Sequence, residues 1–264
     1  MTVTTSSYPR PVTYSAEKVR LVGDLLAQGL SHAEISRRTG VSRWAIRQWE
    51  EFGPEQLAGR RLKSGQGEPH SRTECEARCT VPQAEYAYLL GLYLGDGCLS
   101  ETPKGVFKLR IVLDMKYPHI IGECYRAMGS VLPNRVGRVR RPGCVEVYSY
   151  SKHWPCLFPQ HGRGMKHLRP ILLEDWQHKI AIQEHPQRLL RGLIHSDGCR
   201  VVNEVNGGAY PRYMFSSASP DIQLIFIEAC HELGIVWRRC NARNLSVGRR
   251  DSVARLDEFI GPKR

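Results

Sequence analysis

The chain alternates between segments with the helical spacing of apolar residues and shorter segments in which apolar and polar residues alternate. Residues 118–132 and 219–235 have the spacing of amphipathic helices, whereas residues 106–115 alternate as a half-buried strand does. Two short basic segments, residues 135–141 and 236–243, are also typical of strands. The larger, C-terminal part of the chain is therefore predicted to be a mixed region of helices and strands.

The first fifty residues follow another pattern, in which short helices are separated by helix-stopping signals. Residues 15–30 place apolar side chains on one helical face, with Ser15 as the expected N-cap. Ser31, followed three residues later by a glutamate, has the signature of a capping box. Gly40 supplies the left-handed residue of a tight turn, and Ser42 is expected to cap a third helix.

The second and third of these helices resemble the helix-turn-helix of resolvases and bacterial regulators. The residues that carry the resemblance are Ile35, Gly40-Val41-Ser42, Ile46 and Trp49. It implies a DNA-binding domain over residues 12–52 whose last helix lies in the major groove. The side chains expected to face DNA are Ser42, Arg43, Trp44 and Arg47. The alternative is a small helical bundle that serves packing or dimerisation.

Residues 53–80 begin with many glycines, prolines and charges, and we predict that they form a linker. Cys75 and Cys79 lie near its end at C-x3-C spacing. A structural zinc site usually has four ligands in paired spacing, and no second pair is evident nearby, so the sequence disfavours zinc here. The chain has 9 cysteines and no export signal, which favours thiols over a disulfide framework.

The charge balance narrows the class of partner. The chain holds 38 Lys and Arg against 26 Asp and Glu, a net charge of +12, which suits a polyanion such as nucleic acid. A membrane surface is the weaker alternative, because no apolar run approaches the length of a spanning helix. Without a secretory signal, the protein is expected to be cytoplasmic, associated with the nucleoid and monomeric.

One ten-residue segment occurs twice. Leu89–Cys98 reads LLGLYLGDGC and Leu190–Cys199 reads LRGLIHSDGC, which predicts two related halves over residues 81–182 and 183–264. Small residues recur one helical turn apart and would let the two helix backbones approach closely. The small residues of this expected interface are Gly91 and Gly95 in the first copy and Gly192 and Ser196 in the second.

Packing through these small faces would bring Asp96 and Asp197 together at the ends of both helices. Each carboxylate would then lie at the negative end of a helix dipole and beside a like charge. A bound divalent cation reverses this unfavourable balance, and carboxylate oxygens suit Mg²⁺. At a nucleic-acid backbone such ions promote phosphodiester hydrolysis. The alternative is an Asp-Gly helix stop that occurs twice, and its position in matched halves favours the site.

These two motifs resemble those of single-chain LAGLIDADG homing endonucleases, over roughly residues 81–264. The resemblance implies an α+β fold with two pseudo-symmetric αββαββα halves that form a DNA-binding saddle. It also implies cleavage of double-stranded DNA with Mg²⁺ held by Asp96 and Asp197. Lys166 and Lys263, each in a G-x-K context, would act near the scissile phosphates. The basic residues expected over DNA are Lys108, Arg110, Arg138, Arg140, Arg212, Arg238 and Arg243.

The chain departs from the family pattern at Arg191 and His195, which are expected to loosen the helix interface or to reach DNA. Because the sequence stops just after the second G-x-K, the second half is expected to lack a final helix. A non-cleaving transcriptional regulator on the same scaffold is the alternative function. An intein is disfavoured, since no splicing nucleophile lies near Met1 and the chain ends in GPKR.

Overall fold

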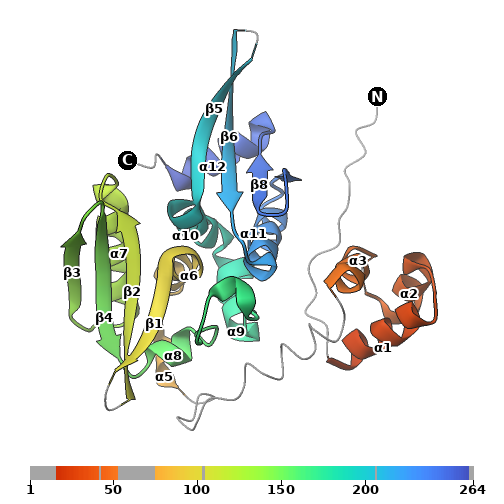
Figure 1. The fold of residues 1–264 in the computed structure, drawn as a ribbon, viewed down its shortest axis with the longest axis horizontal. Helices are drawn as coiled ribbons and strands as arrows, with labels where there is room; N and C mark the ends of the chain where they lie inside the picture. Colours follow the sequence, from red (N-terminus) through yellow and green to blue (C-terminus); the bar gives the residue numbers. More distant parts are fainter. Residues whose placement is uncertain (1–15, 42, 53–74, 103–104, 206, 262–264) are drawn as a thin grey trace. The chain divides into compact units, whose positions relative to one another are not determined.

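The computed structural model describes residues 16–41, 43–52, 75–102, 105–205 and 207–261. The chain divides into two compact units, Met1–Glu68 and Pro69–Arg264, and each is described by itself (Figure 1). The boundary falls inside the segment predicted to be a linker. The end of that predicted linker is helical, however, because α5 (Glu76–Thr80) forms there.

The first unit contains three short helices, α1 (Ala16–Ala27), α2 (His32–Thr39) and α3 (Arg43–Phe52). Apolar side chains from all three helices and the turn before α3 form its core, namely Val22, Leu25, Ile35, Val41 and Ile46. The Ser31 hydroxyl accepts a hydrogen bond from the Glu34 amide at 3.3 Å. The Glu34 carboxylate pairs with Arg38 at 2.9 Å, so only the first half of the capping box forms. Gly40 has a φ of +69°, as the predicted turn requires.

The second unit contains two halves with the same order of elements. The first half consists of α6 (Gln83–Asp96), β1 (Gly97–Thr102), β2 (Val106–Asp114), α7 (Pro118–Val131), β3 (Val136–Arg141), β4 (Cys144–Ser151) and α8 (Trp154–Leu157). The second half consists of α10 (Pro186–Asp197), β5 (Gly198–Val205), β6 (Gly208–Ser216), α11 (Pro220–Glu232), β7 (Arg238–Arg239), β8 (Asn244–Val247) and α12 (Arg250–Ile260). Between the halves lie the short segments η3 (Lys166–Leu168), α9 (Asp175–His178) and η4 (Lys179–Glu184).

Two expectations about the second half are wrong. It does have a final helix, α12, whose apolar face is buried by Val253, Leu256 and Ile260. The predicted strand over residues 236–243 is reduced to the two residues of β7.

Each half contains one four-stranded antiparallel sheet, ordered β1-β2-β4-β3 and β5-β6-β8-β7. Apolar and polar residues alternate in β2, so its apolar side chains all lie on one face of the sheet. Leu109, Ile111 and Leu113 on that face are buried, whereas Arg110 on the other face is exposed. Helix α7 lies against the buried face of the first sheet (Figure 1). We call the opposite side of each sheet its outer face.

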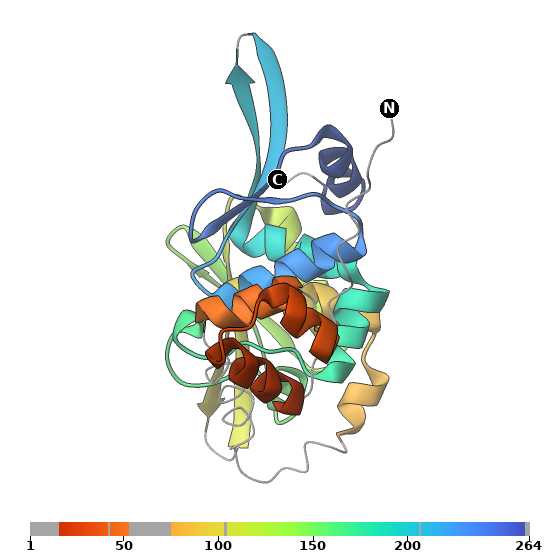
Figure 2. The same ribbon diagram turned by 90° about the vertical axis from the view of Figure 1, so that its right-hand side faces the viewer.

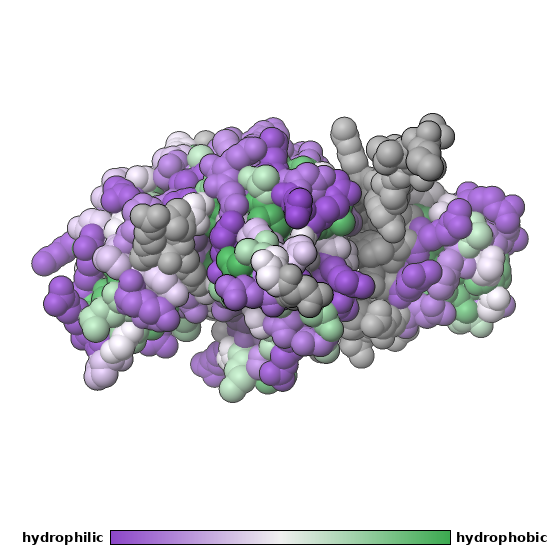
Figure 3. All heavy atoms as spheres, turned by 90° about the horizontal axis from the view of Figure 1, so that it is seen from above, coloured by the Kyte–Doolittle hydropathy of each residue, from purple (hydrophilic) through white to green (hydrophobic). Residues whose placement is uncertain are grey.

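Helices α6 and α10 pack against each other between the two sheets (Figure 1). The hairpin β5–β6 projects beyond the rest of this unit in both side views (Figures 1 and 2). On the face shown in Figure 3, hydrophilic residues predominate and hydrophobic residues form small separate areas. Among the described residues, no helix has the length and apolar content that crossing a membrane requires.

Candidate active site

The two motif helices touch through their glycines. A Cβ atom added to Gly91 would lie 2.5 Å from the carbonyl oxygen of Leu189 and 2.8 Å from the Cα of Gly192. A Cβ atom added to Gly192 would lie 2.9 Å from the Cα of Gly91. Distances this short exclude any side chain, so the glycines are required for the close approach of α6 and α10. One turn further, Gly95 faces the side chain of Ser196.

This contact brings the two motif aspartates to the same place. Asp96 and Asp197 are the last residues of α6 and α10, and both are partly exposed. The Oδ2 atom of Asp197 lies 3.0 Å from the position that a Cβ atom on Gly95 would take. The carboxylate of Asp197 in the second half therefore lies against Gly95, the residue before Asp96 in the first half.

Lys166 reaches this position from η3. Its Nζ donates hydrogen bonds to the carbonyl oxygens of Tyr93, Leu94 at 3.0 Å and Gly95 at 2.8 Å, at the C-terminal end of α6. Burial lowers the pKa of Lys166 to about 8, although the negative charges of Asp197 and Asp96 act to raise it. The ammonium group thus lies in the field of both carboxylates. Lys263, its predicted counterpart, lies outside the described residues.

Arg191 and His195 neither loosen the interface nor point away from it. The Arg191 guanidinium donates to both carboxylate oxygens of Glu123 on α7, at 2.8 Å each, and to the carbonyl oxygen of Phe259 at 2.6 Å. His195 is buried and bonds the Tyr88 hydroxyl at 3.0 Å. Its other ring nitrogen lies 3.1 Å from the carbonyl oxygen of Ile260. Together these contacts tie α6, α7, α10 and α12 to one another, and we call them the polar network.

Glu123 is the central residue of this network, and sequence reasoning missed it. Burial on its own raises the pKa of Glu123, but the hydrogen bonds and charge of Arg191, with the charges of His195 and Arg188, outweigh burial and lower it. Glu123 is the single acidic residue of α7. A lone carboxylate in an amphipathic helix, together with two unexplained basic residues in a motif helix, was the signal available in the sequence.

The strand register decides which basic residues share an outer face. In the first sheet, Arg110 pairs across the strands with Cys98 and Tyr148, and its side chain is exposed. Lys108 lies on the same face but forms an ion pair with Glu146 at 2.5 Å, and its Nζ lies 4.4 Å from the centre of the Tyr148 ring.

Arg138 and Arg140 do not share that face. They pair in register with Val147 and Val145, whose side chains are buried beneath the helices. The Arg138 guanidinium lies 4.0 Å from the centre of the Tyr125 ring of α7. Strand β3 therefore presents Arg138 and Arg140, both expected over DNA, to the helical side of the sheet and not to its outer face.

In the second sheet, Arg212 and Arg238 are on the outer face, paired with Val201 and Ser246. The Nε atom of Arg212 is buried and has no hydrogen-bond partner among the described residues. Arg243 is exposed in the turn between β7 and β8 rather than in a strand.

In the first unit, Arg43 and Arg47 are exposed on α3, as expected of outward-facing residues. Ser42 and the side chain of Trp44 lie outside the described residues. The exposed arginines lie on one helix that follows the Gly40 turn. Two of the four side chains expected to face DNA, Arg43 and Arg47, are therefore exposed on the expected helix.

The donor set at the ends of α6 and α10 fits a hard divalent cation. The carboxylates of Asp96 and Asp197 end the two helices where the helix dipoles are negative, and the charges of both act on the single positive charge of Lys166. Mg²⁺ prefers such oxygen ligands and completes its coordination with water or phosphate oxygens.

No family model matches the chain, and no curated protein matches it. Among solved structures, it is similar to variants of the homing endonuclease I-DmoI, with 15% identity, a TM-score of 0.43, and coverage of 67% of this chain and 96% of that chain. The homing endonuclease I-WcaI, bound to its DNA recognition sequence, has 10% identity, a TM-score of 0.46 and coverage of 76% and 92%. The N-terminal LAGLIDADG domain of WhiA has 12% identity, a TM-score of 0.40 and coverage of 75% and 93%.

These similarities concern the fold. The predicted α+β architecture with two four-stranded antiparallel sheets is confirmed. The solved structures that resemble it include LAGLIDADG homing endonucleases, the family whose motifs the sequence resembles.

Proposed function

We propose that the chain is a site-specific, double-strand DNA endonuclease of the LAGLIDADG homing type that hydrolyses phosphodiester bonds with Mg²⁺. One observation carries the proposal. Helices α6 and α10 meet at Gly91 and Gly192, each helix ends in an aspartate, and the carboxylate of Asp197 lies against Gly95. Two helix stops with no further role would not require this convergence.

Asp96 and Asp197 are the residues that would hold the cation. When bound, Mg²⁺ activates a water molecule and stabilises the leaving oxygen. The two carboxylates would hold the ion, and their partial exposure leaves them open to the substrate backbone. Lys166 adds a positive charge beside them, which favours the approach of a phosphate and stabilises its developing charge. Lys263 has the same proposed role in the second half.

The outer faces supply the proposed contacts with double-stranded DNA. Arg110, Arg212 and Arg238 lie on these faces, where their guanidinium groups are suited to phosphate oxygens. Lys108 is engaged with Glu146, so it contributes less. Helix α3, with exposed Arg43 and Arg47, is the proposed reading helix of an additional DNA-binding module.

The test is a cleavage assay on a library of DNA duplexes, in Mg²⁺ and in Ca²⁺. Cuts are expected with Mg²⁺, and Asp96→Asn or Asp197→Asn should each reduce the rate at least ~100-fold, because each removes a charged ligand from the site. Binding of the same duplexes should survive both substitutions.

Asp175→Asn is the matched control, since this exposed carboxylate begins α9, which contacts α6 at Tyr86 and not at its terminal aspartate. It should leave cleavage unchanged. The proposal would be overturned if the unaltered protein bound specific duplexes but cleaved none of them in all the divalent metals tested. That result would support the non-cleaving regulator.

A further inference from the structure

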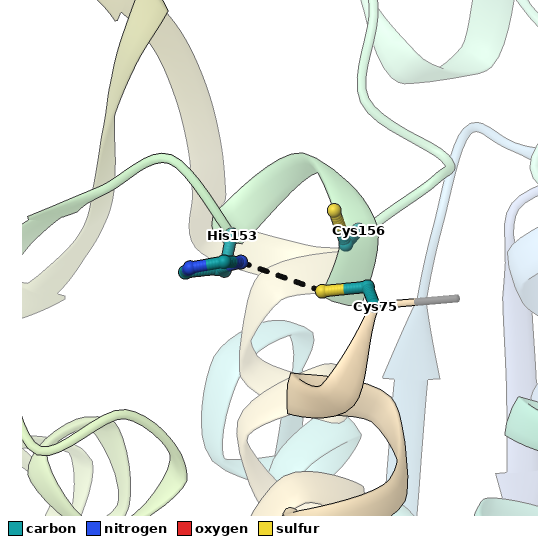
Figure 4. A group of neighbouring side chains, drawn as sticks. All are labelled: Cys75, His153 and Cys156. Atoms are coloured by element: carbon teal, nitrogen blue, oxygen red, sulfur yellow. Dashed lines mark hydrogen bonds between the residues drawn. The ribbon is translucent and has the colours of Figure 1, made fainter. Parts of the chain in front are cut away.

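Three potential metal ligands meet at a point that the proposed reaction does not use. Cys75 precedes α5, and His153 and Cys156 lie at α8 (Figure 4). The ligand atoms of the three residues all lie within 4.8 Å of one another. The Sγ of Cys75 lies 3.4 Å from the Nδ1 of His153. The two sulfur-bearing residues are buried and the histidine is exposed.

The local backbone explains why these side chains face one another. Cys156 follows His153 by three residues, and its amide donates to the His153 carbonyl oxygen at 3.0 Å, so both side chains lie on one side of a single turn. Arg78 in α5 donates from its Nε to the carbonyl oxygen of Cys156 at 3.1 Å. This bond fixes α5 beside α8 and holds Cys75 against the turn.

The distances suit a tetrahedral ion. With Zn–S bonds of ~2.3 Å and Zn–N bonds of ~2.0–2.1 Å, ligand atoms around zinc lie about 3.5–3.8 Å apart. The Cys75–His153 distance of 3.4 Å is close to this value, and the limit of 4.8 Å for all three pairs leaves little adjustment to make. Two thiolates and an imidazole also match the preference of zinc for sulfur and nitrogen ligands.

We propose that Cys75, His153 and Cys156 bind one structural zinc ion. It joins α5, at the beginning of the described part of the second unit, to the turn that follows β4. The sequence offers a further thiol at Cys79, whose side chain lies outside the described residues. Cys75, which the sequence alone disfavoured as a zinc ligand, thus meets two further ligands in a segment that begins 78 residues away.

Metal analysis of the full-length protein, purified without chelators, tests the proposal. We expect about one zinc per chain by mass spectrometry. Replacement by Co²⁺ should give the thiolate charge-transfer and tetrahedral ligand-field bands. Cys75→Ser and Cys156→Ser should lose the metal and these bands, and Cys240→Ser, at an exposed cysteine in the second half, should keep both.

His153→Gln keeps the test decisive if the buried cysteine variants do not fold, because His153 is exposed. This variant should fold and bind zinc at least ~10-fold more weakly, since one ligand is lost. Three results would each overturn the proposal: no zinc bound after incubation with Zn²⁺, an unchanged zinc affinity in His153→Gln, or a disulfide between Cys75 and Cys156 in the native protein. None of these measurements depends on DNA cleavage.

Discussion

The two motif helices solve the same packing problem with different side chains. Helix α6 is buried and apolar beside its glycine face, where Leu90 and Leu94 occupy the positions that Arg191 and His195 occupy in α10. In α10 those two side chains pair with Glu123, Tyr88 and backbone carbonyls of the last helix. The glycine contact is therefore a requirement of the backbones, whereas the rest of the helix can be apolar or polar if its polar groups are satisfied.

The common feature of the two helices is also the one whose loss should cost most. Gly91→Ala and Gly192→Ala are each expected to destabilise the second unit by at least ~3 kcal/mol, because the new methyl group meets backbone atoms of the other helix that cannot move aside. Urea denaturation followed by circular dichroism measures the change.

Gly122→Ala is the control for this pair. Gly122 lies in α7, and a Cβ atom there would meet only the Nη1 of Arg126 at 3.5 Å, an ordinary contact. It should be neutral or stabilise by up to about 1 kcal/mol through its greater helix propensity. Equal stability of Gly91→Ala and Gly122→Ala would contradict the close approach of α6 and α10.

The ion pair between Arg191 of α10 and Glu123 distinguishes this helix from α6, and Glu123→Gln removes it. The substitution leaves the Arg191 guanidinium without its carboxylate in a site where both side chains are largely buried, 15% and 12% exposed. We expect a loss of about 2–3 kcal/mol at pH 7, measured by urea denaturation. Glu258→Gln, which removes an exposed pair with Arg255, should change little.

The stabilisation lost in Glu123→Gln is expected to depend on pH. The pKa of Glu123 is lowered in the folded protein from its ordinary value of 4.5, so its stabilisation is complete above that value and is lost as the pH falls through the lower, folded pKa. The stability difference between the unaltered protein and Glu123→Gln should therefore narrow in acid, below about pH 4.5. A difference that stays constant down to about pH 3 would argue against an ionised Glu123 as its source.

The smallest expected effect comes from making α10 more like α6. His195→Leu removes both hydrogen bonds of the buried imidazole and leaves the Tyr88 hydroxyl without this partner, at a cost of about 1–2 kcal/mol. Adding Tyr88→Phe removes the hydroxyl as well, so the double variant should be less destabilised than the sum of the two single variants. Additive losses in thermal unfolding would show that the two groups are not coupled.

Local patterns were sufficient for much of this protein. The repeated motif, the position of both aspartates and the glycines at the helix interface were all evident in the sequence, because each depends on spacing within one or two helical turns. The alternation in residues 106–115 likewise predicted the buried face of β2 correctly. The final helix α12 was missed because the second G-x-K, just before the end of the sequence, was expected to precede a final helix. Residues 250–260 do have an amphipathic spacing.

By itself, then, the sequence indicated the two halves, many of their elements and the aspartates that end the motif helices. Only the tertiary structure decided how polar side chains far apart in the chain are satisfied. Arg191 meets Glu123 across 68 residues, and Cys75 meets His153 across 78. It also decided that Arg138 points to the helices, because strand register, rather than residue type, fixes the face of an edge strand. Periodicity records burial within an element, whereas partners and faces depend on how the elements pack.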